Sequence, residues 1–342
     1  DFALKLVSKD GDVAGAGVGT ILTTKNDGNG KITFGPIEYT EEGTYVYEAS
    51  ETSKSGNGIS VDTSIFTVTV KVKDNGLGQL VIESKTVTKK GAAEPLAFKN
   101  EYKTGEAEAE VKATKTLTGR DLKAEEFEFS LTPVSAVAED GTAITDSNAA
   151  QTTKNTVGGD VVFEKLKYTK AGTYTYEMKE TSVDGNGVTV DSTIYTVTVT
   201  VVDNGKGILT ATPAYSIDKE KADPEFRNTY KAEPVETTVE GTKTLTGQTL
   251  KEDQFDFELK LVKKNGITVS GDAQTVMTAK NKADGSISFG TLKYTEAGTY
   301  VYEAKETSES GNGISVDTSI FTVTVEVEDN GLGQLVIKNK TV

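Results

Sequence analysis

The stretch TSIFTVTVKVKDNG at Thr63–Gly76 decides the fold of this chain. Apolar and polar residues alternate along it, and a period of two is typical of a half-buried antiparallel strand. The Asp-Asn-Gly at its end is the strongest short-range signal for a hairpin turn. We therefore expect two paired strands at this point, the first of them with one buried face. The residues expected on that face are Phe66, Val68, Val70 and Val72.

Close relatives of this stretch occur twice more, as STIYTVTVTVVDNG at 192–205 and TSIFTVTVEVEDNG at 318–331. The segments GTYVYEASET, GTYTYEMKET and GTYVYEAKET recur in the same order, so the chain consists of three copies of one unit. Strands and turns in a unit of this size predict an all-β fold of three tandem immunoglobulin-like β-sandwich domains in an elongated array. Because Asp1–Val87 matches Asp256–Val342 more closely than either matches the middle copy, we expect a cut-out from a longer array of alternating domain types.

The repeats place the domains at 1–102, 109–230 and 237–342. Aligned on the middle copy, the first domain is expected to lack its first strand and the third domain its last. The linkers KTGEAEA (103–109) and KAEPVET (231–237) are short and charged, and neither is rich in Gly and Ser. That composition predicts limited movement between domains.

The composition removes several classes of function. The chain of 342 residues has a net charge of -15, which argues against binding of nucleic acid or of an anionic membrane. It has neither Cys nor His, so disulfides, thiolate nucleophiles, imidazole bases and the common zinc sites are excluded, and we expect no metal and no cofactor. No apolar run of about 18 residues and no basic-then-apolar leader is present. We expect any such signals to have been removed or to lie outside this segment.

Three polar residues of the middle copy fall on strand faces that are otherwise apolar. Counting in steps of two places Lys115, Glu180 and Asn228 on these faces. The neighbours on the same faces are Val111, Ala113 and Leu117 for the Lys, Tyr174, Tyr176 and Met178 for the Glu, and Phe226 and Tyr230 for the Asn. The same counting gives Glu51 and Asn100 in the first copy, and Lys243 and Glu306 in the third.

Burial of these three groups would change their chemistry. A lone buried charge costs several kcal/mol, and desolvation raises the pKa of a Glu and lowers that of a Lys. A neutral Lys amine is a nucleophile. A protonated Glu could polarise the Asn carbonyl and carry a proton to the departing nitrogen, which would leave a Lys–Asn amide and ammonia.

The patterns TKTLTG, Tyr-x-Tyr-x-x-x-Glu and Phe-x-Asn-x-Tyr occur in this order and resemble the pilin isopeptide-linkage domains of streptococcal and related Gram-positive surface proteins. They resemble collagen-adhesin B-type domains more loosely. The resemblance implies that Lys115 bonds to Asn228 with the help of Glu180 as catalytic residue. It implies the same roles for the residues present in the incomplete copies. Those residues are Glu51 and Asn100 in the first copy and Lys243 and Glu306 in the third, where the bonding partners lie outside the same domain copy.

The resemblance further implies a structural stalk of a Gram-positive adhesin or pilus-like fibre, extracellular and anchored to the cell wall. It implies a single cross-linking reaction per domain and no turnover enzyme. The expected partners are neighbouring domains of the array, other copies in a fibre, and a host ligand of unknown nature. The chain shows no Leu-Pro-x-Thr-Gly sorting signal, which favours a stalk of a long single-chain adhesin over a polymerised pilus. The alternative function is a module that binds a host matrix protein or a glycan.

The sequence also allows simpler structural interpretations of the same residues. Lys115 could extend its head into water, Glu180 could be an ordinary buried partner of a Lys, and Asn228 could close a turn. The acidic Asp-Asn-Gly turns could suggest calcium loops, but the ligand ladder of a calcium loop is missing. A glycosidase pair of Glu177 and Glu180 is disfavoured, because the two residues point to opposite sides of their strand.

Overall fold

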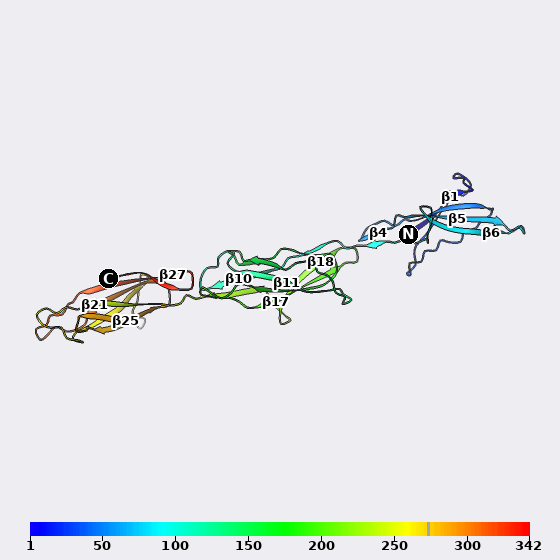
Figure 1. Cartoon of the computed structure of the whole chain (residues 1–342). Helices are drawn as coiled ribbons and strands as arrows, with labels where there is room; N and C mark the ends of the chain where they lie inside the picture. Colours follow the sequence, from blue (N-terminus) through cyan, green and yellow to red (C-terminus); the bar gives the residue numbers. More distant parts are fainter. Residues whose placement is uncertain (272–273) are drawn as a thin grey trace.

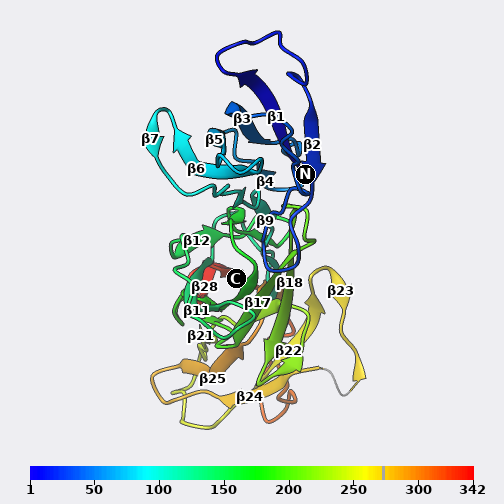
Figure 2. The same cartoon turned by 90° about the vertical axis from the view of Figure 1, so that its right-hand side faces the viewer.

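The computed structural model describes residues 1–271 and 274–342. Within these residues the chain forms strands, turns and loops but no α-helix, which confirms the all-β prediction. Three domains follow one another in an elongated array (Figure 1). In Figure 2, which looks along the array from the first domain, the middle domain partly overlaps both end domains in projection.

The middle domain contains two facing sheets. Its main sheet has the order β12-β11-β15-β17-β18-β19, and its second sheet has the order β13-β10-β20-β16. A further pair, β9 and β14, extends the second layer. The strands are β9 (Ala107–Ala109), β10 (Lys112–Thr118), β11 (Glu128–Val137), β12 (Gln151–Lys154), β13 (Asp160–Val162), β14 (Leu166–Tyr168), β15 (Gly172–Glu180), β16 (Val188–Thr189), β17 (Ile194–Asp203), β18 (Leu209–Ile217), β19 (Glu220–Lys221) and β20 (Glu225–Tyr230).

Strand pairing in the middle domain brings its two ends together. β10, near the start of the domain, pairs in parallel with β20 at its end, with Lys115 opposite Phe226 and Leu117 opposite Asn228. Parallel strands need a long connection, and here the whole main sheet provides it. The core lies between the two layers and includes Val161 and Phe226 from the second sheet, both with 0% exposure.

The first domain has one large sheet, in the order β2-β1-β3-β5-β6-β7, and the short pair β4 and β8. Its strands are β1 (Phe2–Lys9), β2 (Ile21–Thr24), β3 (Gly43–Glu51), β4 (Ile59–Ser60), β5 (Ile65–Asp74), β6 (Leu80–Lys89), β7 (Ala92–Ala93) and β8 (Glu101–Tyr102). Residues 1–102 form no counterpart of β10. The closing segment with Phe98 is consequently only half-buried.

The third domain repeats the large sheet, in the order β23-β22-β26-β27-β28, and β24 also pairs with β22. Its strands are β21 (Val235–Thr242), β22 (Asp256–Lys264), β23 (Ile267–Thr268), β24 (Val276–Lys280), β25 (Ser286–Tyr294), β26 (Gly298–Glu306), β27 (Ile320–Asp329) and β28 (Leu335–Thr341). β21 pairs only with β25 among the described residues, so the edge that β20 covers in the middle domain is open here.

The connections between domains are shorter than the predicted linkers. Ala107–Ala109 is strand β9, and Val235–Thr237 belongs to β21. Ala107 and Ala109 are buried and alternate with an exposed Glu108, so small side chains pack on the core where the charge of the segment had indicated a linker. The linker prediction was therefore wrong at the C-terminal end of both segments.

Candidate functional site

Lys115 lies on β10 and points into the middle domain. The strand alternates between exposed and buried residues, and Lys115 is 2% exposed. The backbone N–H of Lys115 donates to the carbonyl of Gly159 at 2.7 Å and so fixes the strand at this point. The ammonium group lies 4.6 Å from the ring centre of Phe127 and 5.9 Å from that of Phe129. The sequence parity is confirmed, and a Lys that extends its head into water is excluded.

Glu180 joins the three predicted residues. It ends β15, whose odd-even burial pattern places it on the same inner face as Tyr176 and Met178. One carboxylate oxygen, Oε2, accepts from Lys115 Nζ at 2.7 Å, and the other, Oε1, accepts from Asn228 Nδ2 at 2.8 Å. The side chains of Lys115 and Glu180 have 0% exposure. The structure thus brings one amine, one carboxylate and one amide together in a site without water access.

The carbonyl of Asn228 has a different partner from the one expected. The backbone N–H of Asp191 donates to Asn228 Oδ1 at 2.7 Å. A backbone N–H can only donate, so it faces the amide oxygen and leaves the amide nitrogen toward Glu180. In this structure Glu180 therefore contacts the amide nitrogen of Asn228, and the Asp191 N–H contacts the carbonyl oxygen that Glu180 was expected to polarise.

Asp191 is the residue that sequence reasoning missed. Its carboxylate accepts the backbone N–H groups of Thr193 at 2.9 Å and Arg227 at 2.8 Å, which fixes the turn beside β20. Burial opposes ionisation of Asp191, but these hydrogen bonds and that from the Thr193 hydroxyl outweigh it and keep its pKa below the usual range. The signal was present, since Val-Asp followed by Thr or Ser precedes the long strand in all three copies.

The environment of Lys115 favours the neutral amine. Desolvation by burial lowers the pKa of Lys115, and the hydrogen bond and charge of Glu180 oppose the shift without cancelling it. The aromatic rings of Phe129 and Phe226, 5.0 Å apart between centres, add apolar surface near the site. An amine with a lowered pKa that shares a carboxylate with an amide is chemically suited to nucleophilic attack on that amide.

A family model described as FctA, the Spy0128-like isopeptide containing domain, matches residues 1–103, 111–231 and 239–342. The chain belongs to this family. The predicted resemblance to pilin isopeptide-linkage domains is confirmed. Comparison with curated proteins gives no match.

Solved structures include three groups of similar proteins, all distant. The major pilin from Streptococcus pyogenes is 21% identical, with 69% of this chain and 92% of that chain covered and a TM-score of 0.31. The streptococcal ancillary pilin is 15% identical, with 85% and 74% covered and a TM-score of 0.19. The pilus adhesin SpaC from Lactobacillus rhamnosus GG is 13% identical, with 86% and 40% covered and a TM-score of 0.19.

The first Spy0128-like domain contains the Glu and Asn half of the site. Asn100 Nδ2 donates to Glu51 Oε1 at 3.0 Å, and Asn100 Oδ1 accepts from the backbone N–H of Asp62 at 2.8 Å. Glu51 Oε2, the counterpart of the Glu180 oxygen that contacts Lys115, is buried without a partner in the part of the chain that the structure describes. Asn100 makes the same two kinds of contact as Asn228 but is exposed, because no strand equivalent to β10 covers it within residues 1–102.

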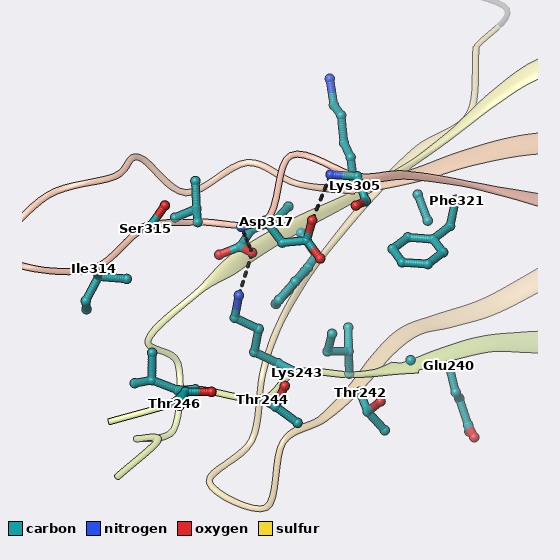
Figure 3. A pocket seen from close by; sticks show the side chains of 18 of the residues that line it. Glu240, Thr242, Lys243, Thr244, Thr246, Lys305, Ile314, Ser315, Asp317 and Phe321 are labelled. Atoms are coloured by element: carbon teal, nitrogen blue, oxygen red, sulfur yellow. Dashed lines mark hydrogen bonds and ion pairs between the residues drawn. The ribbon is translucent and has the colours of Figure 1, made fainter. Parts of the chain in front are cut away.

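The third Spy0128-like domain contains the complementary half. Lys243 Nζ contacts Glu306 Oε2 at 2.6 Å, and Glu306 Oε1 is buried without a partner among the described residues. These residues line a cavity of about 1090 Å³ along β21. Figure 3 shows Lys243 directed across this cavity toward the segment that carries Asp317. The structure therefore brings the predicted residues together in pairs at both ends and as a complete set only in the middle.

Other chemistry finds no support in the described part of the chain. Residues 1–271 and 274–342 contain no cluster of three or more acidic side chains that could hold a metal ion. They also include no helix that is long and apolar enough to span a bilayer.

Proposed function

We propose that the middle domain forms an amide bond between Lys115 and Asn228 in a reaction that the protein carries out on itself. One observation carries the proposal: both nitrogens that must exchange contact the same carboxylate, at 2.7 and 2.8 Å, in a fully buried site. Positioning of this kind replaces a bimolecular encounter and accelerates reactions strongly.

The reaction begins with a proton transfer from Lys115 to Glu180, which gives a neutral amine and a carboxylic acid. Lys115 Nζ then attacks Asn228 Cγ, and negative charge develops on Oδ1. The backbone N–H of Asp191, at 2.7 Å from that oxygen, stabilises this charge as an oxyanion hole does.

Glu180 completes the exchange as a proton relay. The attacking nitrogen loses a proton and Nδ2 gains one, so the new Nζ–Cγ bond replaces the Cγ–Nδ2 bond and ammonia leaves. Glu180 touches both nitrogens and ends this relay as the carboxylic acid formed in the first step. It returns to the carboxylate when it passes that proton to the departing ammonia, which then leaves as ammonium. The reaction consumes its own residues, so it takes place once per domain.

We further propose that the array is an extracellular stalk on a Gram-positive surface. Membership of the isopeptide family and the end-to-end order of the domains support this role. β10 and β20 lie at the two ends of the domain sequence, so an amide between them would pass tension across the second sheet and leave the main sheet unloaded. Closing a loop of roughly a hundred residues would also stabilise the fold by about 4 to 5 kcal/mol in the loop-entropy account.

Single-molecule stretching of the full chain tests this role. The middle domain should add no contour length between Lys115 and Asn228 in the native chain, whereas Glu180→Ala should release that length. Glu177→Ala is the matched control, because Glu177 lies on the same strand but faces outward with 38% of its side chain exposed. A native middle domain that extends as far as Glu180→Ala would contradict the stalk proposal.

A further inference from the structure

Both junctions between domains are built from the same two parts. The first part is the tyrosine that ends the Phe-x-Asn-x-Tyr strand, Tyr102 or Tyr230. The second part is the Asp-Asn-Gly-x-Gly hairpin of the following domain, Asp203–Gly207 or Asp329–Gly333, which we call the hairpin socket.

The tyrosine hydroxyl bonds in the same way in both sockets. Tyr230 donates to Asp329 Oδ1 at 2.7 Å and accepts from the Gly333 N–H at 3.2 Å. Tyr102 donates to the carboxylate of Asp203 at 2.8 Å and accepts from the Gly207 N–H at 2.8 Å. Each socket therefore uses both the donor and the acceptor capacity of a phenol, which a Phe could not provide.

Glycines allow the two domains to approach closely. Gly207 has a positive φ, and a Cβ there would lie 2.6 Å from the Cα of Gly58. A Cβ on Gly187 would lie 2.7 Å from the Cα of Gly333. Any side chain at these four positions would separate the domains, so the glycines are required for contact as well as for the turn.

The first domain carries a third socket. Asp74–Gly78 has the sequence DNGLG, identical to that of Asp329–Gly333. The hairpin already has the occupied geometry: the Gly76 N–H donates to Asp74 Oδ1 at 2.7 Å, as Gly331 does to Asp329 at 2.8 Å. Gly76 and Gly78 have φ values of 80° and 76°.

Nothing occupies this third socket in the described part of the chain. No atom lies within 4 Å of the position that a Cβ on Gly78 would take, whereas Gly207 and Gly333 are in contact with the preceding domain. β5 and β6, which flank the socket, extend toward the end of the array opposite β4 and the middle domain (Figure 1). Leu77 at its tip is 84% exposed.

We propose that Asp74–Gly78 is a docking site for the closing strand of a middle-type domain, with the terminal tyrosine of that strand bound by Asp74 and Gly78. The DNGLG socket of the third domain holds Tyr230 of a middle-type domain, and the first domain presents the same five residues. A middle-type domain also supplies Arg120, whose guanidinium carbon lies 4.7 Å from the ring centre of Tyr230. The third domain has Gln248 at the corresponding place, so a middle-type partner offers the additional stacking contact.

A seamless extension of the full chain tests the proposal. Residues 109–255 are placed directly before Asp1, because Asp1 aligns with Asp256, so the added segment supplies a middle domain and a strand equivalent to β21. The chain has no Cys, so spin labels can be attached at Thr196→Cys of the added domain and at Glu48→Cys, both exposed strand positions. The existing junction, labelled at Thr196→Cys and Glu303→Cys, is the reference.

We expect a single narrow distance across the new junction, as across the existing one. Tyr230→Phe in the added copy, which leaves every hairpin unchanged, should broaden that distance, and Asp74→Ala should do the same. Tyr47→Phe, which removes a phenol hydroxyl away from the junction, should leave the distance across the new junction narrow. In the chain without the extension, Asp74→Ala should leave the distance between Thr196→Cys and Glu303→Cys unchanged. A new junction that is broad from the start, or narrow but insensitive to both Tyr230→Phe and Asp74→Ala, would overturn the proposal.

Discussion

Glu180 is the residue through which the whole site is organised, because each of its oxygens has a separate partner. The incomplete domains separate these two contacts. Glu51 retains the contact to an Asn and Glu306 the contact to a Lys. In each case the other oxygen is buried and finds no partner within residues 1–271 and 274–342. A buried oxygen without a hydrogen bond costs free energy. Each half-site would therefore gain from the group that the middle domain supplies to that oxygen, a Lys amine for Glu51 and an Asn amide for Glu306.

Replacing Glu180 by Gln tests the relay at the residue scale. Gln has the same shape but cannot exchange a proton in the required way, so we expect no Lys115–Asn228 bond. Compared with Asn228→Ala, which also lacks the bond, the Glu180→Gln domain should be about 3 to 5 kcal/mol less stable, because the buried Lys115 loses its counter-charge. Peptide mapping and urea unfolding measure the two effects. Glu177→Gln should change neither, and a cross-linked peptide in Glu180→Gln would show that the carboxylate is dispensable.

The pKa of Lys115 gives a second prediction at this scale. In Asn228→Ala the bond cannot form, and burial keeps the pKa of Lys115 below its ordinary value of 10.5. Between the lowered and the ordinary pKa the unfolded chain binds more protons than the folded one, so the free energy of unfolding should rise with pH in that window. Urea unfolding across this range measures it. Asn228→Ala/Lys115→Met should lack this rise, and equal slopes in the two variants would contradict the lowered pKa.

Elements position the site through the close approach of β10 to the turn before β13. Gly159, with a φ of 88°, lies so close to Lys115 that an added Cβ would collide with the Lys115 carbonyl oxygen. The third domain repeats this contact between Gly285 and Lys243. The turn thus fixes the position of Lys115 along the direction of β10.

Gly159→Ala should therefore displace Lys115 and slow bond formation. Gly141→Ala is the matched control, since Gly141 has a φ of 81° and no atom within 4 Å of the added Cβ. Both variants carry a backbone strain of roughly 1 kcal/mol, but only Gly159→Ala should delay the cross-link after refolding from denaturant. Mass spectrometry of the cross-linked fraction over time measures the rate of bond formation. Equal rates in the two variants would show that the turn does not position Lys115 for the reaction.

Local sequence patterns predicted which side chains of these strands face the core. Alternation placed Lys115, Glu180 and Asn228 on inner faces because side-chain direction in a strand depends only on the count of residues. The same rule could not reveal that the Asp191 N–H holds Asn228 Oδ1, because that contact depends on how a turn folds back over a strand in space. Strand β9 was missed because its charged composition outweighed the small alanines that pack inward.

At the scale of the whole molecule, the open cavity of the third domain should accept a closing strand from outside. A peptide with the sequence of residues 94–103, which includes Asn100, carries the amide that Glu306 Oε1 lacks. Incubated with the full chain, it should bond to Lys243 and add its mass less one ammonia. The same peptide with Asn100→Ala should not react. Failure of the native peptide to add to Lys243 would indicate that the half-site is inactive.

The intact mass of the full chain is the most direct measure of the central claim. We expect a mass one ammonia below that of the sequence, with Lys115 and Asn228 in one cross-linked peptide after digestion. Glu180→Ala should have the full mass of its own sequence. A native chain that retains the full sequence mass and yields Lys115 and Asn228 in separate peptides would contradict this claim.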